Sequence, residues 1–146
     1  MAVPTLTKFL RHDWRGRCLL LEALATLGWA KLLLVTVPFR WIAPRLGRPM
    51  AESAVEISLA EQQLARRVSW AVEAVARAAP LGFVCLPQAI AAKWMLRRRR
   101  LGSTLYLGLR RGEAAGLTAH AWLRAGDQIL TGRAGSQAHH TVASFA

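Results

Sequence analysis

Residues 81–100 read LGFVCLPQAIAAKWMLRRRR, and this stretch sets the architecture around which the rest of the chain is arranged. Proline is well tolerated in the first turn of a helix, where its missing N–H group has no intrahelical partner to lose. The stretch therefore predicts a short extended link over Leu81–Val84 and then a helix, Leu86–Arg100, which begins at Leu86 or Pro87. Cys85 lies directly at its start.

Two more helices are predicted before this one. A Leu-rich run, Cys18–Val37, ends before Pro38. Ser58 and Glu61 have the spacing of a capping box, in which each side chain bonds the backbone N–H group of the other residue. The helix after this box should run to Pro80, because apolar residues recur at helical spacing at Leu64, Val68, Ala71, Val72, Val75 and Ala79. Between the two helices a loop is indicated by Pro44, Gly47 and Pro49.

After Gly102 the hydrophobic pattern alternates, which is typical of strands. The predicted strands are Thr104–Arg110, Leu117–Arg124, Gln128–Thr131 and, at an edge, Thr141–Phe145. Helices first and a meandering antiparallel sheet last predict the α+β class. We expect a helical segment, residues 1–50, packed on a core of residues 51–146, with both in one continuous domain.

The composition is compatible with a folded domain that has a hydrophobic core, since 53% of the 146 residues are hydrophobic. A net charge of +12 should attract an acidic peptide, nucleic acid or an anionic membrane, and charge alone does not choose among them. The two cysteines, Cys18 and Cys85, lie in unlike contexts, which favours a reducing compartment over a disulfide framework. Glu22 and Lys31 interrupt the apolar run Cys18–Val37, so we expect a buried or peripheral helix in a cytoplasmic protein rather than a membrane span.

Cys85 has the features of a nucleophile. A thiol reacts as the thiolate, and both the positive end of a helix and a nearby imidazolium would favour that form. Unpaired N–H groups at the same helix end would also receive the oxyanion of a tetrahedral intermediate. The alternative is an ordinary buried cysteine.

His120 is the best candidate for the partner of Cys85. It lies between two alanines in the strand Leu117–Arg124, so small neighbours leave room around its ring. Strand alternation places it on one face with Thr118, Trp122 and Arg124, and it places Leu117, Ala119, Ala121 and Leu123 on the other face. A strand histidine without a catalytic role remains the alternative.

The motifs around Cys85-Leu86, Gln88-Ala89, Trp94–Arg97, Leu107–Arg110 and His120–Leu123 together resemble the leader peptidase of lasso-peptide biosynthesis. This is the microcin-processing type, with a papain/transglutaminase-like cysteine-protease core. The resemblance covers about Leu59 to Phe145. It implies a cytoplasmic endopeptidase with Cys85 as the nucleophile, His120 as general base and acid, and no metal or cofactor.

The same resemblance implies an aspartate about a dozen residues after the histidine, but the matching stretch here is Thr131-Gly132. The nearest acid is Asp127, seven residues past His120 and in a predicted turn, where Asp is also a common turn former. Asp127 is therefore one candidate for orienting His120. A backbone carbonyl, Thr131 or a partner protein are the others.

The partners follow from the same resemblance. Fused members of the family carry a leader-recognition domain ahead of the protease, whereas this chain has helices there. We therefore expect a separate leader-recognition protein, a precursor peptide bound through its leader, and a lasso cyclase that uses the product. A peripheral membrane contact through the N-terminal helices stays open.

Three other functions were weighed. The run Arg97–Arg100 with Trp94 would suit a nucleic-acid module, although basic residues at a helix end also complement its dipole. His139 and His140 suggest a metal, but neighbours on a strand point to opposite faces and hardly bind one ion together. A thiol-dependent acyl transferase would use the same core, with an amine instead of water resolving the thioester.

Overall fold

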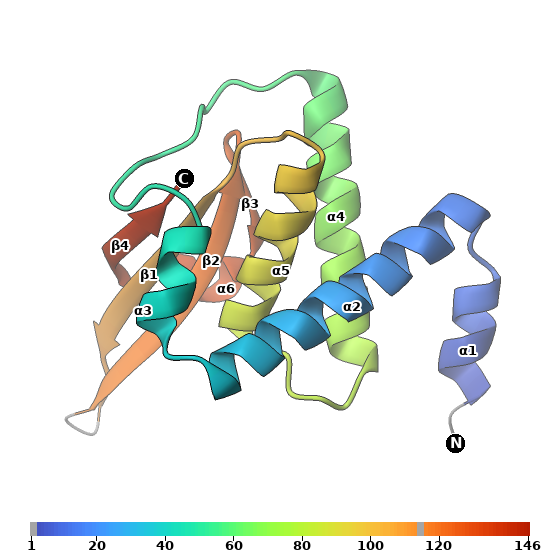
Figure 1. The fold of residues 1–146 in the computed structure, drawn as a ribbon, viewed down its shortest axis with the longest axis horizontal. Helices are drawn as coiled ribbons and strands as arrows, with labels where there is room; N and C mark the ends of the chain where they lie inside the picture. The colour runs from blue at the N-terminus through green and yellow to red at the C-terminus, as the bar shows by residue number, and fades with distance from the viewer. Residues whose placement is uncertain (1–2, 114–115) are drawn as a thin grey trace.

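The computed structural model describes residues 3–113 and 116–146, and it has helices first and an antiparallel sheet last (Figure 1). The α+β class is therefore confirmed. The helices are α1 (Val3–Leu10), α2 (Trp14–Thr36), α3 (Phe39–Ile42), the 3-10 turn η1 (Ala43–Arg45), α4 (Leu59–Ala78), α5 (Cys85–Arg98) and α6 (Arg133–Ser136). The strands are β1 (Thr104–Arg111), β2 (Leu117–Ala125), β3 (Gln128–Thr131) and β4 (His140–Phe145).

Side-chain caps set where two of the long helices begin. The capping box before α4 is confirmed, since Glu61 N donates to Ser58 Oγ over 3.2 Å and Ser58 N donates to Glu61 Oε2 over 2.7 Å. Helix α2 begins at Trp14, earlier than the predicted Leu-rich run, because the Asp13 carboxylate accepts the N–H group of Gly16 over 3.0 Å. A cap outside the apolar pattern thus extends the helix.

Three short elements depart from the predicted loops. Helix α3 and the turn η1 occupy part of the predicted loop around Pro44, and α6 follows β3 where no helix was expected. Each has three or four residues, too few to produce a hydrophobic period in the sequence. Farther along the same loop, Pro49 pairs with Phe145 in an isolated bridge.

The sheet has the order β3-β2-β1-β4, and every neighbouring pair is antiparallel. The predicted hairpins and the predicted C-terminal edge strand are confirmed, with β4 beside β1. In the β1–β2 register, Thr104 pairs with Arg124 and Gly108 pairs with His120. This register fixes the height of His120 along the sheet.

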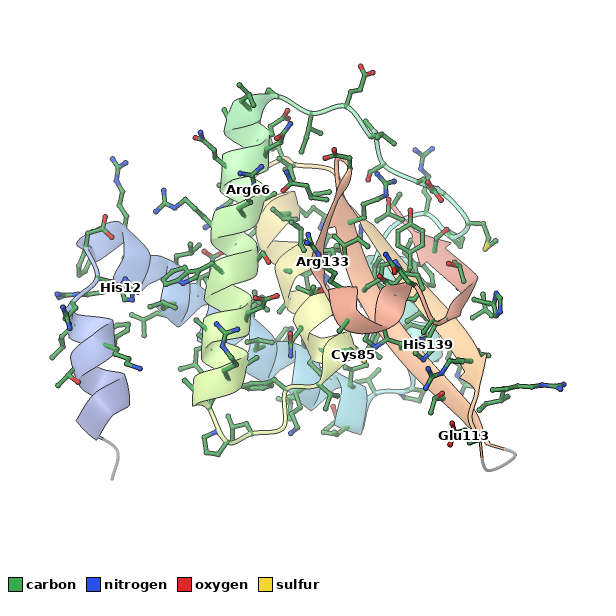
Figure 2. The ribbon with its side chains drawn as sticks, turned by 180° about the vertical axis from the view of Figure 1, so that it is seen from behind. His12, Arg66, Cys85, Glu113, Arg133 and His139 are labelled. Carbon is green, nitrogen blue, oxygen red and sulfur yellow. The ribbon has the colours of Figure 1, made fainter. Side chains whose placement is uncertain are left out.

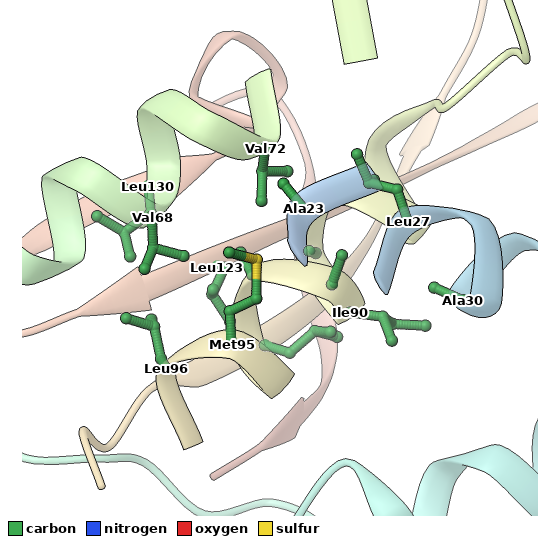
Figure 3. Close-up of a cluster of buried hydrophobic side chains, with 14 of the residues drawn as sticks. Ala23, Leu27, Ala30, Val68, Val72, Ile90, Met95, Leu96, Leu123 and Leu130 are labelled. Carbon is green, nitrogen blue, oxygen red and sulfur yellow. The ribbon is translucent and has the colours of Figure 1, made fainter. Parts of the chain in front are cut away.

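The two faces of the sheet have different covers. Helices α4 and α5 pack on the face that carries Ala121 and Leu123, and α2 packs on α4 and α5. Side chains such as Leu27, Val72 and Ile90 complete this core (Figure 3). The opposite face carries Trp122, which is buried but lies outside that core cluster. Figure 2 shows α6 in front of this second face. The division of the chain into residues 1–50 and 51–146 stays a prediction.

Candidate active site

Cys85 is the first residue of α5, one position earlier than the earliest predicted start. The helix cap is Val84, whose side chain makes no capping hydrogen bond. The N–H groups of Cys85 and Leu86 therefore have no side-chain acceptor at the cap, Pro87 has no N–H group, and Gln88 N donates to the Val84 carbonyl oxygen over 3.3 Å. Cys85 is a free, half-buried cysteine.

The segment before Cys85 is held by several contacts. Gly82 has a φ of 62°, a left-handed conformation that glycine adopts without a steric cost. Gln88, in the first turn of α5, donates through Nε2 to the carbonyl oxygen of Phe83 over 2.6 Å. Lys31 of α2 lies over the Phe83 ring, with Nζ 5.8 Å from the ring centroid. The position of the thiol thus depends on two helices.

His120 lies in a stack of rings on the second face of the sheet. Its ring centroid is 6.0 Å from that of Trp122 at an interplanar angle of 23°, and 5.1 Å from that of His139 at 32°. Trp122 stacks in turn on Tyr106, with centroids 5.5 Å apart. The imidazole is therefore packed between an indole and a second imidazole.

One hydrogen bond sets the tautomer of His120. Its Nε2 lies 2.7 Å from the carbonyl oxygen of Gly132. A carbonyl oxygen only accepts, so Nε2 must carry the proton and donate. In the neutral ring Nδ1 is then unprotonated and free to accept a proton from another group.

Glycines provide the space that the ring needs. A Cβ atom on Gly135 would lie 2.6 Å from both Cδ2 and Nε2 of His120, and one on Gly132 would lie 3.0 Å from Nε2. Gly132 also has a φ of 71°, and its added Cβ would be only 2.3 Å from the Ala121 carbonyl oxygen. The His120 site is thus built against bare backbone.

The predicted contact between Asp127 and His120 is not formed. Asp127 lies in the turn between β2 and β3, beyond the Ala125 end of β2, whereas the ring of His120 bonds Gly132. Thr131 does not hold the ring either, because its buried Oγ1 has no hydrogen-bond partner among the described residues. Of the predicted alternatives, the backbone carbonyl is the one that contacts the ring.

Ideal helix and strand rises, counted from one contact between the two layers, place Cys85 and His120 at comparable distances along α5 and β2. Lys93 Nζ donates to the Ser103 carbonyl oxygen over 2.5 Å, next to the Thr104–Arg124 pair, and this contact marks a common level. Cys85 lies eight residues back along α5, about 12 Å at 1.5 Å per residue. His120 lies four residues back along β2, about 13 Å at 3.3 Å per residue.

Cys85 and His120, which both lie in the described part of the chain, nevertheless form no hydrogen bond with each other. Ala121 and Leu123 point to α5, so by alternation His120 and Trp122 point to the face covered by α6. In Figure 2, Cys85 is seen at the end of α5 and His139 near α6. The sequence suggested a role for His139 only as a metal ligand. Its Nδ1 donates to the Gly135 carbonyl oxygen over 2.7 Å, which makes it part of the packing around His120.

The basic run at the end of α5 is largely occupied by internal contacts. Arg98 and Arg99 both bind the Glu22 carboxylate at 2.6 Å, and hydrogen bonding to Arg99 is the main cause that holds the pKa of Glu22 below its usual value. Arg97 donates to the Arg45 carbonyl oxygen over 2.9 Å. These guanidinium groups have structural partners already. In the part of the chain that the structure describes, no three His, Cys, Asp or Glu side chains form a group able to hold a metal.

Residues 33–144 match the family model described as the transglutaminase-like superfamily. The match includes α4, α5 and the sheet, and with them Cys85, His120 and Gly132. Neither the curated proteins nor the solved structures gave a match.

Proposed function

Because this chain belongs to the transglutaminase-like superfamily, we propose that it is a cysteine endopeptidase that removes the leader from a ribosomally made lasso-peptide precursor. Cys85 is the nucleophile and His120 the general base and acid. The Cys85 thiolate attacks the scissile carbonyl carbon, and the C–N bond breaks as the imidazolium protonates the departing core amine. His120 then takes a proton from water, which attacks the thioester and releases the leader as a free acid.

The observation that carries this proposal is the hydrogen bond from His120 Nε2 to the Gly132 carbonyl oxygen. It holds the ring in the tautomer that leaves Nδ1 free to exchange a proton with a thiol. Gly132 stands twelve residues after His120, the spacing at which the resemblance to leader peptidases implies an aspartate. A main-chain dipole therefore takes the place of the carboxylate.

Catalysis requires Nδ1 to reach the Cys85 sulfur. In unliganded enzymes catalytic hydrogen bonds are often long and tighten only when substrate binds. Closure of this kind would have to bring the thiol at the start of α5 to a ring that points to the face covered by α6, with the leader peptide seated between them. The helix terminus at Cys85 then supplies N–H donors for the oxyanion.

Leader recognition is assigned to a separate protein. Helix α2 contributes Ala23 and Leu27 to the same core as α4 and α5, so it is part of the protease rather than a recognition module. The recognition protein would present the precursor in trans, and the freed core amine would then pass to the lasso cyclase. Both cysteines are free, as expected for an enzyme of the reducing cytoplasm.

The test is co-expression with the products of the neighbouring genes, which the proposal expects to include the precursor and the recognition protein, followed by mass measurement of the products. We expect slow cleavage by the chain alone, much faster cleavage with the recognition protein, and none with Cys85→Ala. Cys18→Ala is the matched control, because Cys18 is the other free cysteine and should be dispensable. An uncut precursor in every sample counts against the proposal, and an amide adduct of the leader would indicate acyl transfer instead of hydrolysis.

A further inference from the structure

The outer face of α2 is an apolar ridge with no partner in the described residues. Its large exposed side chains are spaced three, five or seven residues apart, and they are Trp14, Leu21, Leu24, Trp29, Leu32 and Val35. At 1.5 Å per residue the ridge is about 30 Å long. In Figure 1, α2 lies across α4 and α5. An apolar stripe of this length on the surface indicates an interaction site.

Charges near the middle of the ridge are already paired. Glu22, at its border, is bound by Arg98 and Arg99, and Arg17 donates to the His12 carbonyl oxygen over 2.9 Å. The ridge therefore presents hydrocarbon and indole along most of its length. A protein interface of this size would be expected to combine such a core with a polar rim of hydrogen-bonding groups.

Exposed cations stand at both ends of the ridge. Arg11 and Arg15 flank Trp14, and Arg40 and Arg45 flank Trp41, whose side chain is 60% exposed. Tryptophan and arginine together at the border of an apolar surface are typical of the interface between lipid headgroups and acyl chains. The net charge of +12 has the sign that anionic headgroups attract.

A groove adjoins the ridge at its N-terminal end. A cavity of about 610 Å³ lies between α1, α2 and α4, and its apolar lining includes Phe9, Leu20 and Val75. Leu21 and Leu24 belong both to this lining and to the ridge, so the two form one continuous apolar surface. The groove has the chemistry to accept part of an acyl chain.

We propose that the ridge and the groove dock this protein on the surface of an anionic phospholipid membrane. By length and composition α2 could cross a bilayer, but one third of that apolar window is buried inside the protein. Its inner face, with Ala23 and Leu27, belongs to the core, and Glu22 is held by two arginines. The helix therefore lies in the plane of the membrane interface instead of spanning it.

The test is cosedimentation of the full chain with vesicles of phosphatidylcholine, with and without phosphatidylglycerol. We expect binding to the vesicles that contain phosphatidylglycerol, weaker binding to pure phosphatidylcholine, and partial release by salt. The double variant Trp29→Gln/Leu32→Gln should bind at least about tenfold more weakly, because two apolar side chains no longer enter the interface. Leu117→Gln is the matched control, since Leu117 is 70% exposed on the β1–β2 hairpin and should leave binding unchanged.

A second readout needs no change to the ridge. Cys18 is exposed and lies on the same side of α2, so its alkylation by a water-soluble maleimide should slow when anionic vesicles are added. A Cys85→Ser background leaves one reporting thiol. The proposal is overturned if anionic vesicles bind no protein, if the ridge variant binds as well as the wild type, or if Cys18 stays unprotected. Ridge-dependent self-association or capture of the recognition protein, without vesicle binding, would also overturn it.

Discussion

Replacing Gly135 by alanine places a methyl group against the ring of His120. The added Cβ would lie 2.6 Å from Cδ2 and Nε2 of the ring, about 1 Å closer than ordinary van der Waals contact allows. The ring is enclosed on other sides by Trp122 and His139, so it has to tilt or slide as a whole. A retreat of about 1 Å would stretch the 2.7 Å bond to the Gly132 carbonyl oxygen past the usual limit of about 3.2 Å.

The expected costs differ between stability and catalysis. Loss of one hydrogen bond should lower the unfolding free energy by about 0.5–1.5 kcal/mol. Alanine is favoured over glycine inside a helix, so the substitution in α6 should raise the unfolding free energy by about 0.5–1 kcal/mol. Crowding of the enclosed ring costs about 1–3 kcal/mol more, so the net loss in unfolding free energy should be about 0.5–4 kcal/mol. If His120 is the general base as proposed, misplacing it by about 1 Å should slow the proposed leader cleavage by roughly 10- to 100-fold.

Two assays separate these effects. Cleavage of the precursor with the recognition protein, followed by mass spectrometry, gives the rate, and denaturant unfolding gives the stability. Nitrogen NMR of the imidazole side chains reports which nitrogen of His120 carries the proton, and the variant should lose the fixed Nε2–H form. Gly28→Ala is the control, because nothing lies within 4 Å of its added Cβ and neither activity nor tautomer should change. If Gly135→Ala cleaves at the wild-type rate with the same tautomer, the Gly132 carbonyl does not position His120.

Three further predictions concern stability. Burial lowers the pKa of Lys93 to about 8 from its ordinary value of 10.5. The unfolded chain therefore binds the proton more tightly than the folded chain does. The unfolding free energy should rise between about pH 8 and 10.5 as a result. Thermal melts of Lys93→Met across this range should lack that rise. Glu22→Gln should cost about 1–2 kcal/mol at neutral pH by removing the charge that binds Arg99, and a denaturation curve that does not shift would contradict this. Because the pKa of Glu22 is lowered in the fold, its contribution is present above pH 4.5 and is lost as the pH falls through the lowered pKa, a loss absent from the variant. Ser58→Ala should lower the unfolding free energy by about 0.5–2 kcal/mol, because the capping box is lost. Urea unfolding measures this change. Ser136→Ala is the control, because the Ser136 hydroxyl donates only to the Arg133 carbonyl oxygen in the exposed α6.

The sequence contains strong signals for the long elements. Ser58 and Glu61 locate the start of α4 because a capping box needs those side chains at that spacing. The alternating hydrophobic pattern after Gly102 indicated the four strands, although parts of β1 and β2 are buried on both faces. Short elements such as α3 and α6 gave no such signal, since their few residues are placed by the surrounding fold.

The sequence predicts only those parts of the candidate site that consist of side chains. Cys85 at a helix start and His120 in a strand were found from residue type and position. A backbone carbonyl was one of the expected alternatives, but the sequence did not single out the one of Gly132. Every residue carries a carbonyl group, and no residue type marks the carbonyl that accepts a hydrogen bond. The useful signal was the pair of glycines at 132 and 135, which leaves a bare backbone at the spacing where an acid was sought. Asp127 was chosen because it is an acid, but the register of β2 and β3 places it at the other end of the strand.

The bond from His120 to a main-chain oxygen has a consequence for how this protein would respond to mutagenesis. A triad acid can be deleted by changing one codon, but the acceptor at Gly132 persists whatever side chain stands there. Alanine scanning of acidic residues would therefore find no third member for the proposed Cys85–His120 pair. Only a change of the backbone atom itself, such as a thioamide at this peptide bond, would test the acceptor chemically and leave the shape of the site in place.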